Sequence, residues 1–249
     1  MLQQVEDLIE GGSDIEQIRS KIRSDRTVST IFVDICSFGE MTAQMSSTIV
    51  YETRTFVFKK LSDILAPHHL YFVKPMGDSA HFCGGIGDDV ETQTETATNC
   101  IRGVIQILDS IDKINLRLRE QDLPGIELKV SATLGHAEFG LEGTSNDLRF
   151  DVQGHWINMA KRLEDAMNSD FYQKYGKNCA LVSENLFKFC KDIRLQERFA
   201  LKHNIKDKHS IVINARVGQQ YPDQINRDDA LEAIYGQFAH KSKNRKASG

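Results

Sequence analysis

The sequence lacks several features that would each define a class of protein. No apolar run approaches the ~20 residues needed to cross a bilayer, and residues 1–10 carry acids where a secretory signal is basic and then apolar. Lys and Arg number 31 against 35 Asp and Glu, giving a formal net charge of −4. Nucleic-acid binders are usually strongly basic, so we expect a protein that does not bind nucleic acid. From the missing span and secretory signal we expect a cytoplasmic protein that does not bind a membrane.

The five cysteines do not indicate a disulfide framework or a zinc site. Their number is odd, and none forms a CxxC pair or a Cys/His cluster with zinc-ligand spacing. We therefore expect reduced, mostly buried thiols at Cys36, Cys83, Cys100, Cys179 and Cys190.

The chain does contain enough apolar sequence to build a core. Of its 249 residues, 40% are hydrophobic and 27% are charged, close to the globular average. The order of its apolar strands and amphipathic helices predicts an α+β domain around one central sheet. Residues 28–168 follow the βαββαβ order of a ferredoxin-like core, with additional C-terminal strands and helices beyond it.

Three parts are predicted: a helical segment at 1–26, a main domain at 27–216, and a C-terminal helix with a basic tail at 217–249. The strands are expected near 27–34, 70–73, 79–83, 127–134, 150–152, 180–182, 194–202 and 209–216. The helices are expected near 45–65, 91–121 and 154–167, after Ser183, and near 227–238.

Two aspartates end up near one edge of this sheet. Asp34 closes a buried strand, and Asp78 lies in the Lys74–Asp78 linker between the next two strands. In a βαββαβ unit the first strand lies beside that hairpin, so the two carboxylates are expected to meet. Paired carboxylates repel, and Mg²⁺ ions that also bind substrate phosphates would relieve this conflict. The alternative is a capping role for Asp34 and a simple turn role for Asp78.

A second group lies on the predicted helix near 154–167. Asn158 and Arg162 are four residues apart and therefore share one helical face. Asn is a poor helix former, and the planar guanidinium of Arg suits phosphate. The alternative is a late cap for Asn158 and a solvated charge network of Arg162 with Glu164 or Asp165.

Together these residues resemble the catalytic domain of class III nucleotidyl cyclases, the adenylate and guanylate cyclase family. The resemblance covers about 27–216 and predicts the class III cyclase fold. Its motifs are Phe32-Val33-Asp34-Ile35 with Phe38, Lys74 with Gly77-Asp78, and Asp151 with Gly154, Asn158 and Arg162.

The resemblance implies a phosphorus–oxygen lyase that acts as a head-to-tail homodimer with its active sites at the interface. Asp34, Asp78 and the carbonyl of Ile35 would hold two Mg²⁺ or Mn²⁺ ions at each site. From the other chain, Asn158 would orient the ribose and Arg162 would stabilise charge on the α-phosphate.

Further positions would bind the phosphates of a nucleoside triphosphate substrate. The resemblance places Lys206 at a triphosphate-binding position, with Lys208 as an ambiguous neighbour. It also places the amides that follow Asp34, including that of Phe38, around phosphate oxygens. His136 stands where some members have an arginine near the phosphates, which is a departure from the family pattern.

Lys74 and Asp151 occupy the positions that read the base in adenylate-type members. Asp151 would accept from an exocyclic amino group and Lys74 would donate to a ring nitrogen. Adenine and cytosine present this edge, whereas guanine and uracil reverse it. We therefore rank ATP first, CTP second, and GTP and UTP lower.

Other functions stay open at this point. The chain also resembles small stand-alone bacterial cyclases that make cyclic CMP or cyclic UMP in anti-phage defence, where the base rule is less reliable. An inactive, cyclase-like regulatory domain is a further alternative. A diguanylate cyclase is disfavoured because the hairpin reads Met76-Gly77-Asp78-Ser79 and lacks the Gly-Gly-Asp/Glu-Glu-Phe motif.

Overall fold

The computed structural model describes residues 23–86, 92–144, 147–206 and 212–220. The chain divides into two units, residues 1–219 and 220–249. The predicted C-terminal helix at 227–238 and basic tail lie outside the described residues, as do residues 1–22 of the predicted helical segment. The first strand starts at Ser24, so residues 24–26 are strand and not helix.

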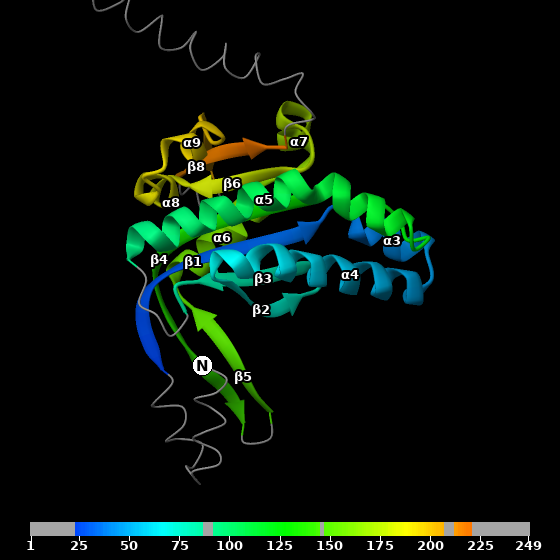
Figure 1. The fold of residues 1–249 in the computed structure, drawn as a ribbon, viewed down its shortest axis with the longest axis horizontal. Helices are drawn as coiled ribbons and strands as arrows, with labels where there is room; N and C mark the ends of the chain where they lie inside the picture. The colour runs from blue at the N-terminus through cyan, green and yellow to red at the C-terminus, as the bar shows by residue number, and fades with distance from the viewer. Residues whose placement is uncertain (1–22, 87–91, 145–146, 207–211, 221–249) are drawn as a thin grey trace, which may run out of the picture. The chain divides into compact units, whose positions relative to one another are not determined.

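An eight-stranded sheet forms the centre of the first unit (Figure 1), with the order β2-β3-β1-β4-β6-β8-β7 and β5 paired to β4. The strands are β1 Ser24–Ile35, β2 Leu70–Met76, β3 Ser79–Gly84, β4 Leu128–Thr144, β5 Asp147–Gln153, β6 Cys179–Ser183, β7 Leu201–Lys206 and β8 Val212–Gln219.

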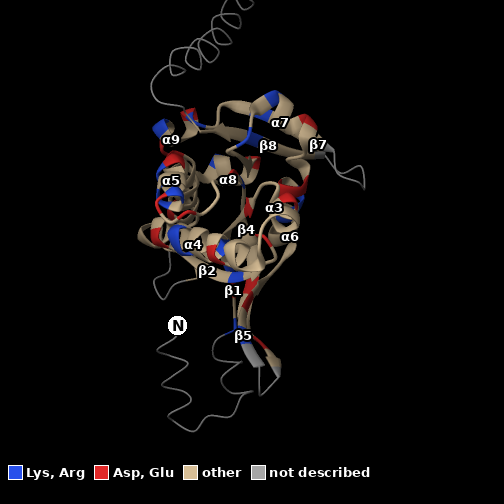
Figure 2. Cartoon of the chain, turned by 90° about the vertical axis from the view of Figure 1, so that its right-hand side faces the viewer, with Lys and Arg blue, Asp and Glu red and all other residues tan. Residues whose placement is uncertain are grey.

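Helices cover both faces of this sheet. They are α3 Phe38–Gln44, α4 Ser47–Leu65, α5 Gln93–Arg119, α6 His155–Ala166, α7 Ser169–Tyr175, α8 Glu184–Phe189 and α9 Ile193–Glu197, with a short 3-10 turn at Ala66–His68. Lys and Arg are mixed with Asp and Glu along α4 and α5 (Figure 2). None of the described helices combines the length and apolarity that a membrane crossing needs.

The predicted α+β class and ferredoxin-like core are confirmed. β1 lies between β3 and β4 and pairs antiparallel with both, as the βαββαβ order requires. Along β1, Ile31 and Val33 point to the main core, which they share with residues of α4 and α5. Phe32 points to the opposite face, where it packs with Ile157 and Ala160 of α6. The site residues lie on this second face, because side chains alternate along a strand.

Two details of the sequence prediction were wrong. Residues 193–197 form helix α9, not a strand, because Asp192 caps it by accepting a hydrogen bond from the backbone N–H of Arg194 at 3.1 Å. The linker from Lys74 to Asp78 is mostly strand: β2 runs through Met76, and only Gly77 and Asp78 form the turn. Gly77 takes φ +68°, a conformation that glycine adopts without strain.

Cross-strand register sorts the residues of the second face into rows. Ser79, Asp34 and Lys129 face one another on β3, β1 and β4, and we call them the acid row. Two residues earlier on β1, Phe32 faces His81, and His81 faces Lys74 of β2. We call Lys74, His81 and Phe32 the ring row. Neighbouring rows on one face are about 7 Å apart.

Candidate active site

The two predicted aspartates converge at the end of β1. Asp34 is the next-to-last residue of that strand, and the backbone N–H of Ile35 donates to the carbonyl of Asp78 at 3.3 Å. This bond holds the hairpin turn against the strand end, so the two carboxyl groups come within hydrogen-bonding reach. Burial, and next the charge on Asp34, raise the pKa of Asp78 above its ordinary value. The pair therefore carries the electrostatic conflict that the sequence predicted.

Polar partners surround the buried carboxylate of Asp34. The Ser79 hydroxyl donates to Asp34 Oδ1 at 2.6 Å, and Lys129 Nζ lies 3.0 Å from Oδ2. The same ammonium lies 3.3 Å from Oε1 of Glu164, a buried residue of α6. Burial lowers the pKa of Lys129, but the hydrogen bonds and charges of Asp34 and Glu164 outweigh burial and hold it above its ordinary value. Lys129 is therefore a cation held between acids.

The donor set fits a divalent cation that bridges to substrate. Carboxylate oxygens are the ligands that Mg²⁺ and Mn²⁺ prefer, and a positive charge already lies against Asp34 in the form of Lys129. The described residues hold no group of three or more His, Cys, Asp or Glu side chains that would form a complete protein site. Such an ion would therefore take its remaining ligands from backbone carbonyls, water or substrate.

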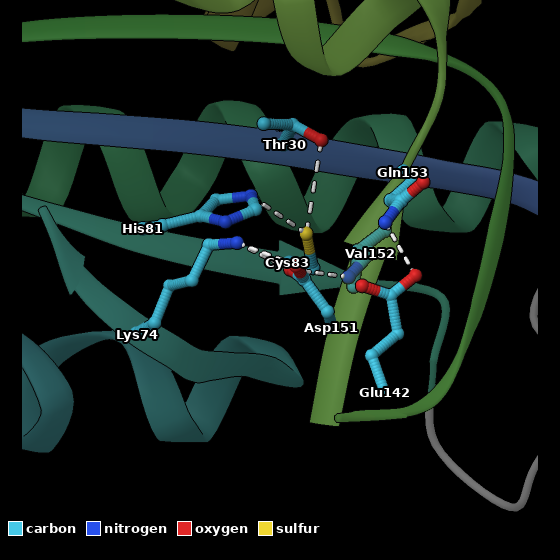
Figure 3. Close-up of polar contacts among 8 residues, drawn as sticks. All are labelled: Thr30, Lys74, His81, Cys83, Glu142, Asp151, Val152 and Gln153. Carbon is cyan, nitrogen blue, oxygen red and sulfur yellow. Dashed lines mark hydrogen bonds and ion pairs between the residues drawn. The ribbon is translucent and has the colours of Figure 1, made fainter. Parts of the chain in front are cut away.

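Lys74 and Asp151, from β2 and β5, meet directly. Lys74 Nζ donates to both carboxylate oxygens of Asp151 at 2.6 Å (Figure 3). Asp151 Oδ1 also accepts the backbone N–H of Val152 at 2.8 Å. Since the sequence separates the two residues by 77 positions, their contact depends on the pairing of β2, β3, β1, β4 and β5 in one sheet.

A cavity of about 430 Å³ opens beside this ion pair. Its polar lining comes from the ion pair, from His81 and Gln153, and from α6, and its apolar lining comes from β1, β2, β5 and α6. The residues that line it are Phe32, Lys74, Met76, His81, Asp151, Val152, Gln153, Gly154, Ile157, Asn158 and Lys161. Neither Asp34 nor Asp78 is among them, so the cavity and the acid pair are separate places on one chain.

Helix α6 supplies the predicted Asn158 and Arg162. Asn158 is exposed and lines the cavity. Arg162, one turn later, is half-buried and lies outside the cavity lining, with Nη1 3.9 Å from Met159 Sδ. Glycine at position 154 lets the helix begin this close to β4. Any other residue would bring a Cβ to only 3.1 Å from the His136 carbonyl oxygen.

Four remaining predicted positions lie away from the cavity. The side chain of Ile35 is buried in the core, and Phe38, the first residue of α3, packs against that core. Lys206 ends β7, and its side chain lies outside the described residues, as does Lys208. His136 is exposed on β4, with Nδ1 3.7 Å from Asp25 Oδ1 and seven residues along that strand from Lys129.

The structure adds three polar residues that motif spacing did not reveal. Lys129 joins the acid row, Lys161 lines the cavity and lies 2.6 Å from Glu164 Oε2, and His81 forms the cavity wall. The sequence holds no signal for Lys129, because a lysine between apolar residues of an alternating strand reads as an exposed position.

The family profile described as the adenylate and guanylate cyclase catalytic domain matches residues 21–174, more than half of the chain. The chain belongs to this family. It is 24% identical over 166 residues to adenylate cyclase 1 of Rhizobium meliloti (strain 1021), a match that covers 67% of this chain. The match spans only 24% of that relative, so the chain corresponds to about a quarter of its length.

Solved structures confirm the cyclase fold. The guanylyl cyclase Cya2 superposes with a TM-score of 0.66 at 14% identity, over 82% of this chain and 96% of its own. The adenylyl cyclase CyaB from P. aeruginosa gives 0.65 at 15% identity, over 82% of this chain and 98% of its own. Because a guanylyl and an adenylyl cyclase fit equally well, the fold alone does not distinguish the base.

Proposed function

We propose that the chain converts a nucleoside triphosphate, ATP in preference to CTP, into a 3′,5′-cyclic nucleotide and pyrophosphate. In this reaction the ribose 3′-oxygen forms a bond to the α-phosphorus and loses its proton. The bond from the α-phosphorus to the β-phosphate oxygen breaks, and pyrophosphate leaves. Membership of the cyclase catalytic domain family supports the reaction class, and the Lys74–Asp151 pair supports the base preference.

One observation carries the proposal: a single chain presents two separate half-sites. The acid pair at the end of β1 lies outside the cavity that Lys74, Asp151 and Asn158 line. The resemblance implies that a nucleotide whose base enters that cavity binds its phosphates at the acid pair of another chain. A second copy in a head-to-tail homodimer supplies that pair, because a two-fold axis exchanges the two half-sites.

Within this arrangement Asp34, Asp78 and the Ile35 carbonyl would hold two Mg²⁺ or Mn²⁺ ions. Such ions lower the pKa of a bound hydroxyl and offset charge on phosphate oxygens. Ser79 keeps Asp34 in one orientation through its 2.6 Å hydrogen bond. The amides between Asp34 and Phe38 would bind phosphate oxygens beside the acids.

The partner chain would hold the rest of the nucleotide. Asn158, which lines the cavity, would hydrogen-bond the ribose, and Arg162 would stabilise charge that develops on the α-phosphate. Lys206 would bind the triphosphate. Lys74 and Asp151 would turn from each other toward the base, donating to a ring nitrogen and accepting from an amino group.

The first experiment identifies the product. Purified protein is incubated separately with ATP, CTP, GTP and UTP plus Mg²⁺ or Mn²⁺, and products are identified by mass. We expect cyclic AMP to form fastest, cyclic CMP next, and both to vanish in Asp34→Asn. Cyclic UMP as the main product would overturn the base preference, and no product from any nucleotide would indicate a regulatory domain.

A second experiment tests the shared site. Asp34→Asn and Asn158→Ala each damage a different half-site, so each variant alone should be nearly inactive. A mixture should regain activity, because a mixed head-to-tail dimer contains one intact site. Random mixing limits the recovery to about a quarter of wild-type activity. No recovery, with mixed dimers demonstrated by two affinity tags, would place both half-sites of one nucleotide on the same chain.

A further inference from the structure

His81 is a buried polar residue in the cavity wall that the mechanism above does not use. It lies on β3 between Phe32 and Lys74 in the ring row, and its ring stacks on Phe32 with centroids 4.5 Å apart and planes at 19°. Its side chain is fully buried, yet it contributes to the cavity lining beside Lys74 and Asp151. Register and stacking therefore fix this imidazole next to the pair that would read the base.

The two nitrogens of this ring have different surroundings. Nε2 lies 3.2 Å from Cys83 Sγ, which in turn lies 3.7 Å from the Thr30 hydroxyl (Figure 3). Nδ1 is buried and has no hydrogen-bond partner among the described residues. Buried polar atoms are usually hydrogen-bonded, so Nδ1 is a position where a ligand in the cavity would supply the missing partner.

The ring is neutral, and in the tautomer where Nε2–H donates to Cys83 Sγ, which we assign here, Nδ1 is an acceptor. Burial, and next the charge of Lys74, lower the pKa of His81 to about 4. Burial raises the pKa of Cys83 to about 12, so the sulfur keeps its proton and can donate it to Thr30 while accepting from Nε2.

We infer that His81 is a base-specificity residue whose Nδ1 accepts the second hydrogen of an exocyclic amino group. The inference rests on the proposed function and extends it. An amino group carries two hydrogens, and Asp151 accepts only one of them when the base lies in a single pose. Adenine and cytosine then satisfy Lys74, Asp151 and His81 together. A guanine or uracil carbonyl at the same position has no hydrogen to donate, so it would face the acceptors of Asp151 and His81 and be repelled by them.

Equilibrium binding of uncleavable nucleotides tests the inference separately from turnover. The probes are the α,β-methylene analogues of ATP, CTP, GTP and UTP, measured by calorimetry with Mg²⁺. His81→Phe keeps a stacking ring and removes the acceptor, and we expect the preference for amino over carbonyl bases to fall about tenfold. His81→Asn returns a short acceptor and should recover part of that preference. His203→Phe, a histidine among Phe171 and Tyr175, is the matched control and should change nothing.

Three outcomes decide the matter. If His81→Phe weakens all four analogues equally, or His81→Asn fails to recover any preference, His81 only supports the wall and the inference is wrong. If the wild-type protein prefers the GTP and UTP analogues, or binds none of the four, the acceptor role is likewise overturned. If the preference shifts as expected while no nucleotide is cyclised, the inference stands and the proposed function fails.

Discussion

The acid row and the ring row lie side by side on one face of the sheet, yet their charges are organised differently. At the acid row, Asp34 lies against a second carboxylate, Asp78 of the neighbouring turn, and Lys129 only partly offsets their like charges. In the ring row, Lys74 is matched by Asp151 in a two-oxygen contact at 2.6 Å. One region therefore holds a surplus of negative charge, whereas the other neutralises itself.

This difference indicates how each region meets its ligand. A surplus of buried negative charge favours a cation, so binding relieves a cost that the folded protein already carries. A ligand that separates a matched ion pair must give each partner an equivalent hydrogen bond. A ligand that pairs with only one of them leaves the other charge without a partner, which costs binding free energy. Under the proposed function, the acids around Asp34 would confer affinity for cations, and the ring row with Asp151 would confer selectivity among bases.

The largest expected effect comes from the acid row. Asp34→Asn keeps the shape and the Ser79 contact but removes the charge, and we expect product formation to fall by about 10³-fold or more. Asp25→Asn is the matched control, because Asp25 is an exposed acid on the same strand. Initial rates at saturating nucleotide measure the effect. A reduction below tenfold in a folded Asp34→Asn protein would contradict a cation site at this position.

The ring row should give a smaller and more selective effect. Lys74→Ala and Asp151→Ala each leave a polar partner unpaired, so we expect kcat/KM for the preferred nucleotide to fall about 10- to 100-fold. The double variant should lose less than the sum of the two free energies, since the residues act as a pair. The exposed Lys177–Glu127 pair is the control, and breaking it should leave kcat/KM unchanged. Equal losses for all four nucleotides would show that the pair does not read the base.

The contrast between the rows also explains how much the sequence revealed. Asp34, Asp78, Asn158 and Lys74 sit in short local motifs, and the βαββαβ order was enough to bring the two acids together. The Lys74–Asp151 contact needed the resemblance, because it depends on β5 folding back along β4. Strand register carries such information, and it is not visible in a single sequence.

The sequence did not predict which polar residues are buried or paired in the site. His81 reads as an ordinary strand residue, and only the structure shows that it is buried against Phe32 and Cys83, where burial lowers its pKa. Lys129 reads as an exposed position on an alternating strand, yet its ammonium lies between Asp34 and Glu164. The helix at α9 was missed because its apolar residues resemble a strand, and the Asp192 cap decides the local structure.

Lys129→Met tests whether this lysine offsets the acid surplus. Without its ammonium, Asp34 and Glu164 are left facing each other, so we expect the metal-free protein to lose about 3 kcal/mol of stability. Mn²⁺ should then raise the melting temperature more in the variant than in the wild type, because the cation replaces the lost charge. Lys177→Met is the control and should leave both quantities unchanged. A smaller Mn²⁺ shift in Lys129→Met would mean that the lysine helps to build the cation site.

The smallest effect concerns the stability that Asp78 removes from the metal-free protein. Its pKa is raised in the folded state, so the folded protein binds more protons than the unfolded chain between the two pKa values. Stability therefore falls as pH rises through that window and stays lower above it. Asp78→Asn should remove this loss, giving a slightly higher melting temperature in EDTA at pH 7 and no gain at pH 3. Because Asp78 is partly exposed, solvent screening keeps the gain below about 1 kcal/mol.

Thermal unfolding at both pH values measures this gain in stability. A variant less stable than the wild type at pH 7 would show that the two carboxylates do not oppose each other. Combined with the expected loss of turnover, a gain in stability would show that the acid pair is retained for chemistry at the expense of the fold.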